Sequence, residues 1–330
     1  MRFTAPSLGV QNDPFLPAKQ WQAQVSYQYA DANDFYVGDQ RNDAAAPSGV
    51  PPVRTVHLIN VDIIYGLSNR LSLDLTIPFV TGSASVMQGP ADSRTLHHFS
   101  ASGLGDMSLQ AEYWLSNPET PSRFTGSVGL GFKAPTGSDD VEGTVGTQTG
   151  DVRAPIDESA QLGTGGWQLL LRAQSAATIK GSLFGYTSGY YGLSLTEHTD
   201  VFNSGVLRGD PDTYSARLGV AYLLPFLLVG GGNDGLANEE GLVVSFGGRI
   251  NGVTVKDLVG GEDLYWRRPG YVIYAEPGLT WTIGRNMATV SVPLRVYANK
   301  LDSPLDDSLN RHVGASFASN LFLASFARRF

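Results

Sequence analysis

Apolar and polar residues alternate with a period of two along much of this chain, and this alternation constrains the fold more than any other feature. From Leu71 to Phe79 every second residue is apolar. The stretches Trp21–Tyr29, Met107–Leu115 and Val290–Ala298 repeat the pattern. Because successive side chains of a β-strand point to opposite faces, each stretch predicts a strand with one apolar and one polar face.

About twelve such stretches occur, each roughly ten residues or longer, which is the length that a tilted strand needs to cross a bilayer. They lie near 20–31, 53–65, 70–80, 106–116, 123–134, 166–178, 182–195, 213–223, 241–251, 271–283, 286–298 and 315–330. We therefore expect an all-β, antiparallel, up-and-down transmembrane β-barrel of about twelve strands, within a range of about ten to fourteen.

The connections between these stretches alternate between long and short, as in bacterial outer-membrane barrels, which have long external loops and short periplasmic turns. Short turns are predicted at Ser68-Asn69, Lys180-Gly181 and Gly284-Arg285. Residues 224–240 are too long for a clean turn and leave room for an extended or additional strand. The long connections lie near 32–52, 81–105, 135–165, 196–212, 252–270 and 299–314.

Composition favours the barrel over its two main alternatives. No run of about 18 apolar residues occurs, so a helical membrane protein is excluded. A soluble β-sandwich also alternates, but its water-facing positions usually carry many Lys and Glu, whereas here they are mostly Gln, Ser, Thr and Gly. Charged residues make up only 16% of the chain.

We expect a single domain over residues 1–330, with residues 1–19 forming a periplasmic N-terminal segment.

The polar faces of the strands are expected to line the lumen, where charged side chains of both signs alternate inward. They form either a constriction that sets selectivity or a set of salt bridges that fills and stiffens a narrow lumen. The candidate lumen-lining residues are Asp62, Asp74, Glu112, Arg123, Arg172, Arg217, Arg249, Glu276 and Arg295.

Enzyme chemistry finds little support in the sequence. Cysteine is absent, which excludes thiol catalysis and cysteine-ligated metals. His57 lies on an apolar strand face, as does the catalytic histidine of lipid-hydrolysing barrels, but Ile59 stands where a serine nucleophile would be needed. His97 and His98 lie in a predicted loop without further metal ligands at suitable spacing. We expect no enzyme activity, no catalytic residues, no cofactor and no metal.

The C-terminus resembles the signal that the outer-membrane assembly machinery reads, although Arg328 departs from its apolar pattern. Phe322, Phe326 and Phe330 lie on one face of the last predicted strand, and the chain ends on the last of them. We expect a location in the bacterial outer membrane, with a signal peptide removed or outside this numbering, because no apolar stretch follows Met1. The expected partners are outer-membrane lipids, lipopolysaccharide, the barrel-assembly machinery and a small-molecule solute. A net charge of −8 argues against nucleic acid.

Several segments, in order, resemble a bacterial outer-membrane "transporter" family that is labelled with meta-pathway phenol degradation. They are Gly66-Leu67-Ser68, Gly103-Leu104-Gly105-Asp106, Gly131-Phe132-Lys133-Ala134-Pro135-Thr136-Gly137, Leu162-Gly163-Thr164-Gly165, Arg268-Pro269-Gly270, Glu276-Pro277-Gly278-Leu279 and Pro293-Leu294-Arg295-Val296-Tyr297. The resemblance covers residues 53–300 and implies a barrel loosely similar to fatty-acid and aromatic-hydrocarbon uptake channels.

From the pattern and the resemblance together we expect a porin-like channel or transporter for small organic solutes, hydrophobic or phenolic in character. A closed structural barrel, acting as an anchor, an adhesin or a subunit of an envelope assembly, is the alternative. In that case the inward arginines and carboxylates would all be paired and the lumen would not conduct. The sequence does not determine the solute, the oligomeric state, or whether the loops at 135–165 and 252–270 fold inward.

Overall fold

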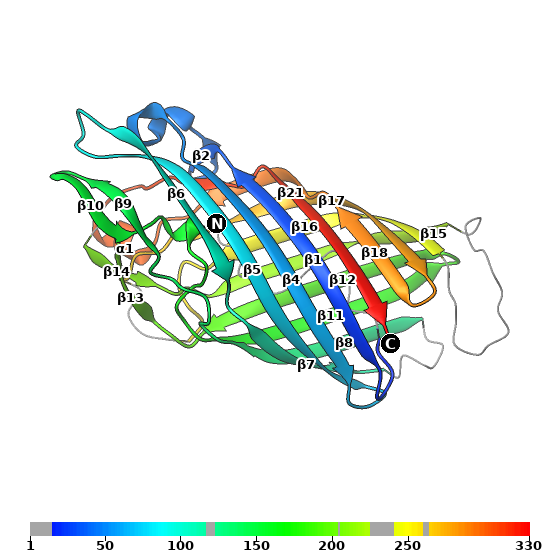
Figure 1. The fold of residues 1–330 in the computed structure, drawn as a ribbon. Helices are drawn as coiled ribbons and strands as arrows, with labels where there is room; N and C mark the ends of the chain where they lie inside the picture. Colours follow the sequence, from blue (N-terminus) through cyan, green and yellow to red (C-terminus); the bar gives the residue numbers. More distant parts are fainter. Residues whose placement is uncertain (1–14, 117–122, 204, 225–240, 260–263) are drawn as a thin grey trace.

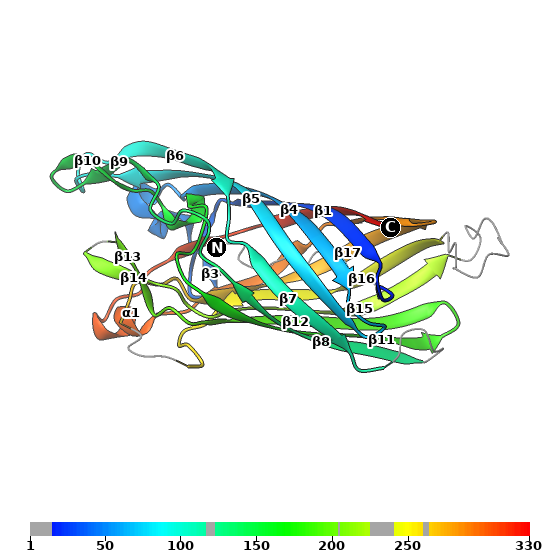
Figure 2. The same ribbon diagram turned by 60° about the horizontal axis from the view of Figure 1, so that its bottom comes forward.

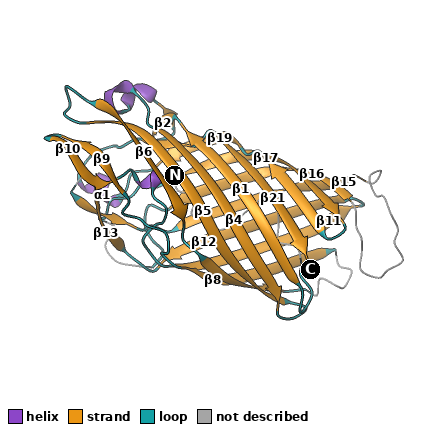
Figure 3. Ribbon diagram, viewed as in Figure 1, coloured by secondary structure: helices purple, strands orange, loops and turns teal. Residues whose placement is uncertain are grey.

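The computed structural model describes residues 15–116, 123–203, 205–224, 241–259 and 264–330. Within these residues, twelve strand positions form a closed antiparallel barrel (Figures 1 and 3). The wall runs in the order β1 (Trp21–Ala32), β4 (Val53–Gly66), β5 (Leu71–Gln88), β7 (Ser108–Trp114), β8 (Phe124–Lys133), β11 (Gln168–Lys180), β12 (Leu183–Ser194), β15 (Thr213–Leu224), β16 (Gly241–Val253), β17 (Gly270–Ile283), the interrupted strand β18 (Asn286–Ser291) and β19 (Leu294–Lys300), and β21 (Asn320–Arg329).

The last strand closes the barrel against the first. β21 pairs with β1 over a continuous register from Gln22 opposite Arg329 to Asp31 opposite Asn320. Each of the twelve predicted segments is confirmed as a position in this wall, with ends that differ by up to eight residues. The short turns are also confirmed. Gly181 and Gly284 adopt positive φ values of 55° and 56° at two of them, a conformation that glycine tolerates best.

Burial follows the period-two pattern and shows which face points inward. Along β1 the polar Gln22, Gln24 and Ser26 are buried inside the barrel, whereas Trp21 and Val25 are about half exposed on the outside. Because lipid rather than water covers the outer face of a transmembrane barrel, exposed apolar side chains there are expected. Part of the interior is apolar as well: Val272 and Tyr274 of β17 pack against Leu321 and Leu323 of β21.

The remaining elements gather at the end of the barrel that carries the long connections (Figures 1 and 2). No helix among the described residues is long and apolar enough to cross a membrane. The elements at this end of the barrel are β2 (Asp34–Val37), β3 (Gln40–Arg41), η1 (Asp43–Ala45), η2 (Pro47–Gly49), β6 (Thr95–Leu104), β9 (Glu142–Thr147), β10 (Gly150–Pro155), η3 (Glu158–Ala160), β13 (His198–Asn203), β14 (Val206–Gly209), α1 (Pro304–Ser308) and β20 (Ala315–Phe317).

Three details differ from the sequence prediction. Residues 81–105 are mostly not a loop, because β5 continues to Gln88 and pairs with β6 in a hairpin that extends beyond the barrel wall. The segment 315–330 is split between β20, which pairs with β2, and β21. In β19, Arg295 lies opposite Tyr274 and Tyr297 opposite Ile273, so Val296 is an extra residue at a bulge. The bulge turns Ala298 inward, contrary to the predicted alternation.

The wall also changes partners along β5. β7 pairs with β5 up to Thr76 opposite Ser108, and β6 resumes the pairing at Phe79 opposite Leu104. Residues 105–107 form the break between them. Among the described strands β6 pairs only with β5, whereas β7 also pairs with β8. Residues 225–240, where an additional strand was considered, and residues 1–14 of the expected N-terminal segment lie outside the described residues.

Candidate solute pathway

Most of the predicted lumen residues do point into the barrel. Seven of them are more than nine-tenths buried, and the Arg295 side chain is 11% exposed. Arg123 is the exception: it is exposed and precedes β8, so it lies at the end of the wall rather than in the buried lumen. The strand begins at Phe124, one residue later than expected. The seven predicted lumen residues that are more than nine-tenths buried are Asp62, Asp74, Glu112, Arg172, Arg217, Arg249 and Glu276.

Glu276 is the centre of one ionic cluster. Arg217 and Arg249 are directly opposite each other on β15 and β16, an arrangement of like charges that is unfavourable by itself. The Glu276 Oε2 atom accepts from Arg217 Nε at 3.0 Å and from Arg249 Nε at 2.9 Å. Ser291 Oγ donates to Oε1 at 2.9 Å. The carboxylate therefore compensates two buried guanidinium groups at once.

A second cluster surrounds Glu112 on β7. Its Oε1 atom accepts hydrogen bonds from Ser127 of β8 and Gln174 of β11, and Arg172 Nη1 lies 4.0 Å from Oε2. Hydrogen bonds from neighbouring strands thus reach one buried carboxylate, as a satisfied polar interior requires. Asp62 is held similarly, by Gln24 Nε2 at 3.1 Å and Thr76 Oγ1 at 2.8 Å.

Residues 156–164, here named the inner segment, fold into the mouth of the barrel. The segment contains η3, and Ala160 is completely buried. On one side Ala160 lies directly on Gly82 of β5, where an added Cβ would be 2.7 Å from the Ala160 Cα. Ile156 and Ala160 pack with Phe99 of the β5–β6 hairpin. The predicted external loop at 135–165 therefore has an inward-folded part.

Asp157 clamps the inner segment to the wall. Arg54 of β4 donates from Nε and Nη2 to the two Asp157 oxygens at 3.2 and 3.0 Å. Arg268 adds a contact of 3.3 Å from Nη2. Burial alone would raise the pKa of Asp157, but the charges of Arg54 and Arg268 and the hydrogen bonds from Arg54 and Ser159 hold it well below the usual value. Asp157 is thus a carboxylate at neutral pH.

A second contact, named here the neck, ties both ends of the loop together at Asp106. The Asp106 carboxylate accepts from the backbone N–H of Gly137 at 3.1 Å and from that of Thr164 at 2.8 Å. Lys133 Nζ lies 3.2 Å from the same carboxylate and also contacts Thr164. A Cβ at Gly163 would be 2.2 Å from the Gly137 oxygen, so the close approach requires glycine.

The neck explains why three of the segments that carry the family resemblance contain glycines beside polar residues. Asp106 comes from the first, Lys133 and Gly137 from the second, and Thr164 from the third. They meet beside the break between β6 and β7. Their common role in this structure is to anchor the loop where the regular ladder stops.

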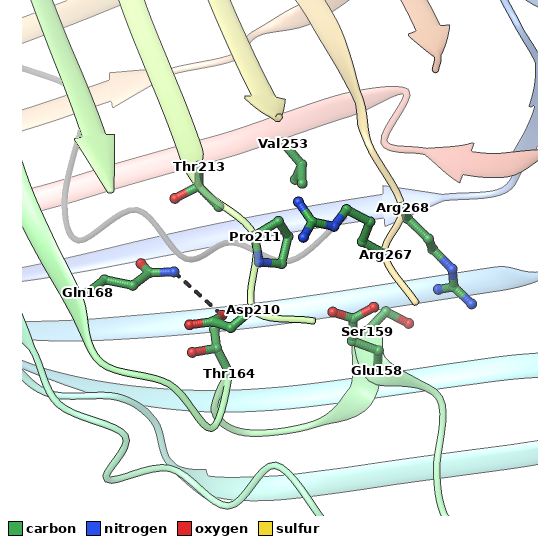
Figure 4. Close-up of a pocket in the computed structure, with 10 residues that line it drawn as sticks. All are labelled: Glu158, Ser159, Thr164, Gln168, Asp210, Pro211, Thr213, Val253, Arg267 and Arg268. Atoms are coloured by element: carbon green, nitrogen blue, oxygen red, sulfur yellow. Dashed lines mark hydrogen bonds between the residues drawn. The ribbon is translucent and has the colours of Figure 1, made fainter. Parts of the chain in front are cut away.

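Two cavities lie at the inner segment. A small one of about 50 Å³ is bounded by the segment and by inward residues of the wall (Figure 4), with Gln168 and Asp210 on one side and Arg267 and Arg268 on the other. A larger cavity of about 760 Å³, the outer cavity, is formed by the long connections. Glu158, Arg267 and Arg268 line both. The inner segment therefore stands between the outer cavity and the lumen.

Several residues on this path were missed at the sequence level. Arg54 and Lys133 share the inward parity of their strands and could have been found by the alternation that identified Asp62. Asp157, Arg208 and Arg268 lie in connections, where no periodicity reports the direction of a side chain. Arg208 contacts the Asp139 carboxylate and donates to the Thr164 carbonyl at 3.1 Å.

No family model matches the chain, and no curated protein matches it. Among solved structures, the COG4313 outer membrane channel from Pseudomonas putida F1 is similar with a TM-score of 0.57 and 15% identity, over 97% of this chain and 100% of that one. A Pseudomonas aeruginosa FadL homologue follows with a TM-score of 0.46 and 9% identity, over 94% and 90%. The P. putida toluene transporter TodX has a TM-score of 0.45 and 9% identity, over 96% and 91%. At this identity the first likeness supports the sequence resemblance at the level of the fold: the chain is an all-β transmembrane barrel built like the COG4313 outer membrane channel.

Proposed function

We propose that this protein is a channel of the bacterial outer membrane for small organic solutes, hydrophobic or phenolic in character. The observation that carries the proposal is the nature of the obstruction. A loop segment lies between the outer cavity and the inward residues of the barrel wall. That segment is held by a few nameable contacts, chiefly Asp157 with Arg54 and Arg268.

The composition of the outer cavity supports a solute of this kind. A volume of about 760 Å³ is in the range of small-molecule sites. Apolar side chains such as Phe35, Trp266 and Val313 line it together with charged groups. The fold shared with a channel protein agrees with the proposal without identifying the solute.

A lipid hydrolase is less consistent with the environment of His57. The imidazole lies on the outer face of β4, and its Nδ1 is 2.8 Å from the Tyr27 hydroxyl. Tyr29 packs against the same ring. The histidine thus belongs to a cluster of aromatic side chains on the lipid-facing side, which is typical of outer-membrane barrels near the interface.

Single-channel conductance in a planar bilayer, at neutral pH and high salt, tests the proposal. We expect discrete current steps, and we expect Arg172→Gln, Arg217→Gln and Glu112→Gln to change the ratio of anion to cation permeability. Silence of folded protein, both in the native chain and in Asp157→Asn, in which the clamp loses its charge, would favour the closed structural barrel instead.

A further inference from the structure

The outer cavity carries more positive than negative side chains, although the whole chain has a net charge of −8. Six cationic and three acidic residues line it. The cations are Arg54, Arg208, Arg267, Arg268, Lys300 and Arg311. Concave sites lined mainly by one sign of charge focus the electrostatic potential and concentrate ions of the opposite sign.

The pairing of these cations shows where one carboxylate serves two of them. Arg208 pairs with Asp139 and Arg267 with Asp257, one carboxylate each. Asp157, in contrast, is shared by Arg54 and Arg268. Asp306 is likewise shared by Arg311 at 2.8 Å and Lys300 at 3.9 Å. Each of these two carboxylates thus serves two cations, and the charge of Glu158 also acts on Arg268.

Arg268 and Arg311 also keep guanidinium N–H groups that these ion pairs do not use. Arg268 contacts Asp157 through Nη2, and its side chain is 28% exposed. Arg311 contacts Asp306 through Nε, and its side chain is 41% exposed. A guanidinium group has five N–H donors in a planar fork that fits a carboxylate. Both arginines can therefore bind a further carboxylate without losing the first.

An apolar surface adjoins these donors. The Arg268 guanidinium carbon lies 4.6 Å from the centre of the Trp266 ring, and Phe35 and Val313 line the same cavity. A neutral hydrocarbon would use only the apolar part of this lining, and an inorganic anion would use only the cationic part. A molecule that combines a carboxylate with an apolar body uses both.

We infer that the outer cavity binds a small organic anion with a carboxylate on an apolar body, such as an aromatic carboxylate, through Arg268 and Arg311. This inference rests on the proposed channel function, since it names the class of solute that the cavity selects. The carboxylate lies against the guanidinium donors, and the apolar body lies against Trp266. Binding at this place also brings the solute next to the Asp157 clamp, because Arg268 both lines the outer cavity and contacts Asp157.

Equilibrium dialysis of radiolabelled benzoate against the purified full chain in detergent tests the inference without requiring conduction. We expect saturable binding and an affinity at least about tenfold higher than for benzyl alcohol, which has a similar ring without the charge. Inorganic phosphate should compete poorly. Equal binding of benzoate and benzyl alcohol, or competition by phosphate at equal concentration, would overturn the inference.

Arginine variants locate the site. Arg268→Gln and Arg311→Gln should each weaken benzoate binding by about tenfold, because each removes charge-assisted hydrogen bonds. Arg153→Gln is the matched control, since Arg153 is an arginine of β10 that pairs with Glu142, is 79% exposed and does not line the cavity. The affinity of Arg153→Gln for benzoate should stay unchanged. An equal loss in Arg153→Gln would mean that benzoate responds only to the overall charge.

Folding is checked for each variant by the change in electrophoretic mobility that folded barrels show on heating. Arg311→Gln keeps the test decisive if Arg268→Gln does not fold, because Arg311 does not contact the clamp. Saturable benzoate binding by a protein that never conducts would uphold this inference and contradict the proposed channel function. Current steps from a protein that does not bind benzoate would do the reverse.

Discussion

At the scale of single residues, the lumen is organised around carboxylates that each serve more than one donor. Glu276 compensates Arg217 and Arg249, and Asp157 compensates Arg54 and Arg268. A buried ion pair contributes little net stability compared with an apolar pair, but removing one partner leaves a desolvated charge. The loss of stability on removing a carboxylate is larger where that carboxylate faces two guanidinium groups.

Replacement of Glu276 by glutamine should therefore destabilise the barrel strongly. We expect Glu276→Gln to lower the free energy of unfolding by about 3–5 kcal/mol, because Arg217 and Arg249 remain buried and directly opposite each other. Urea unfolding of the barrel in detergent, followed by tryptophan fluorescence, measures this. Glu142→Gln on the exposed hairpin is the control, with an expected change of at most about 1 kcal/mol. A similar small change for both variants would contradict the cluster's role.

At the scale of elements, the alternation predicts the wall well and the connections poorly, for a physical reason. A strand such as β5 has one buried and one lipid-facing side, so its pattern survives in the sequence from Leu71 onward. The inward direction of Glu112 and Arg217 follows from that pattern. The inner segment has no such period, because its position depends on Asp157 meeting Arg54, which is 103 residues away. Arg123 lies at the exposed end of the wall for a related reason, since the pattern does not report where a strand ends.

Gly82 offers a direct test of how the inner segment blocks the pathway. An added side chain would lie 2.7 to 3.0 Å from the backbone of Ala160, so Gly82→Val should displace η3 from the mouth of the barrel. We expect a larger single-channel conductance with unchanged barrel closure. Ser83→Val, on the other face of the same strand, is the control and should conduct like the native protein. No increase in Gly82→Val would show that the segment does not limit the current.

At the scale of the whole molecule, the two shared carboxylates predict how the proposed channel responds to acid. The pKa of Asp157 is depressed, as described above. Burial by itself raises the pKa of Asp306, but hydrogen bonds from Ser303 and Arg311 and the charge of Lys300 lower it overall. A depressed pKa stabilises the closed arrangement at every pH above the ordinary carboxyl value of about 3.9, and the stabilisation is lost as the pH falls below it.

Conductance should therefore remain constant between about pH 8 and pH 5 and rise only as the pH falls below about 4 toward the depressed pKa of Asp157, where the carboxylate takes up a proton and the clamp weakens. A bilayer recording with stepwise acidification on the loop side measures this. In Asp157→Asn the low-pH rise should disappear, because the titrating group is gone. A transition between about pH 6 and 7 would contradict this role of Asp157, because its depressed carboxyl pKa lies well below that range.

The neck at Asp106 separates what the barrel must keep from what it can change. Both ends of the loop meet one carboxylate, so the polypeptide between Gly137 and Thr164 leaves and re-enters the wall at a single point. Its length and composition can vary without shifting the register of β8 or β11. A chain that retains the neck can therefore carry a different inner segment on the same wall. For protein engineers, the neck marks the place where this loop can be exchanged as a cassette.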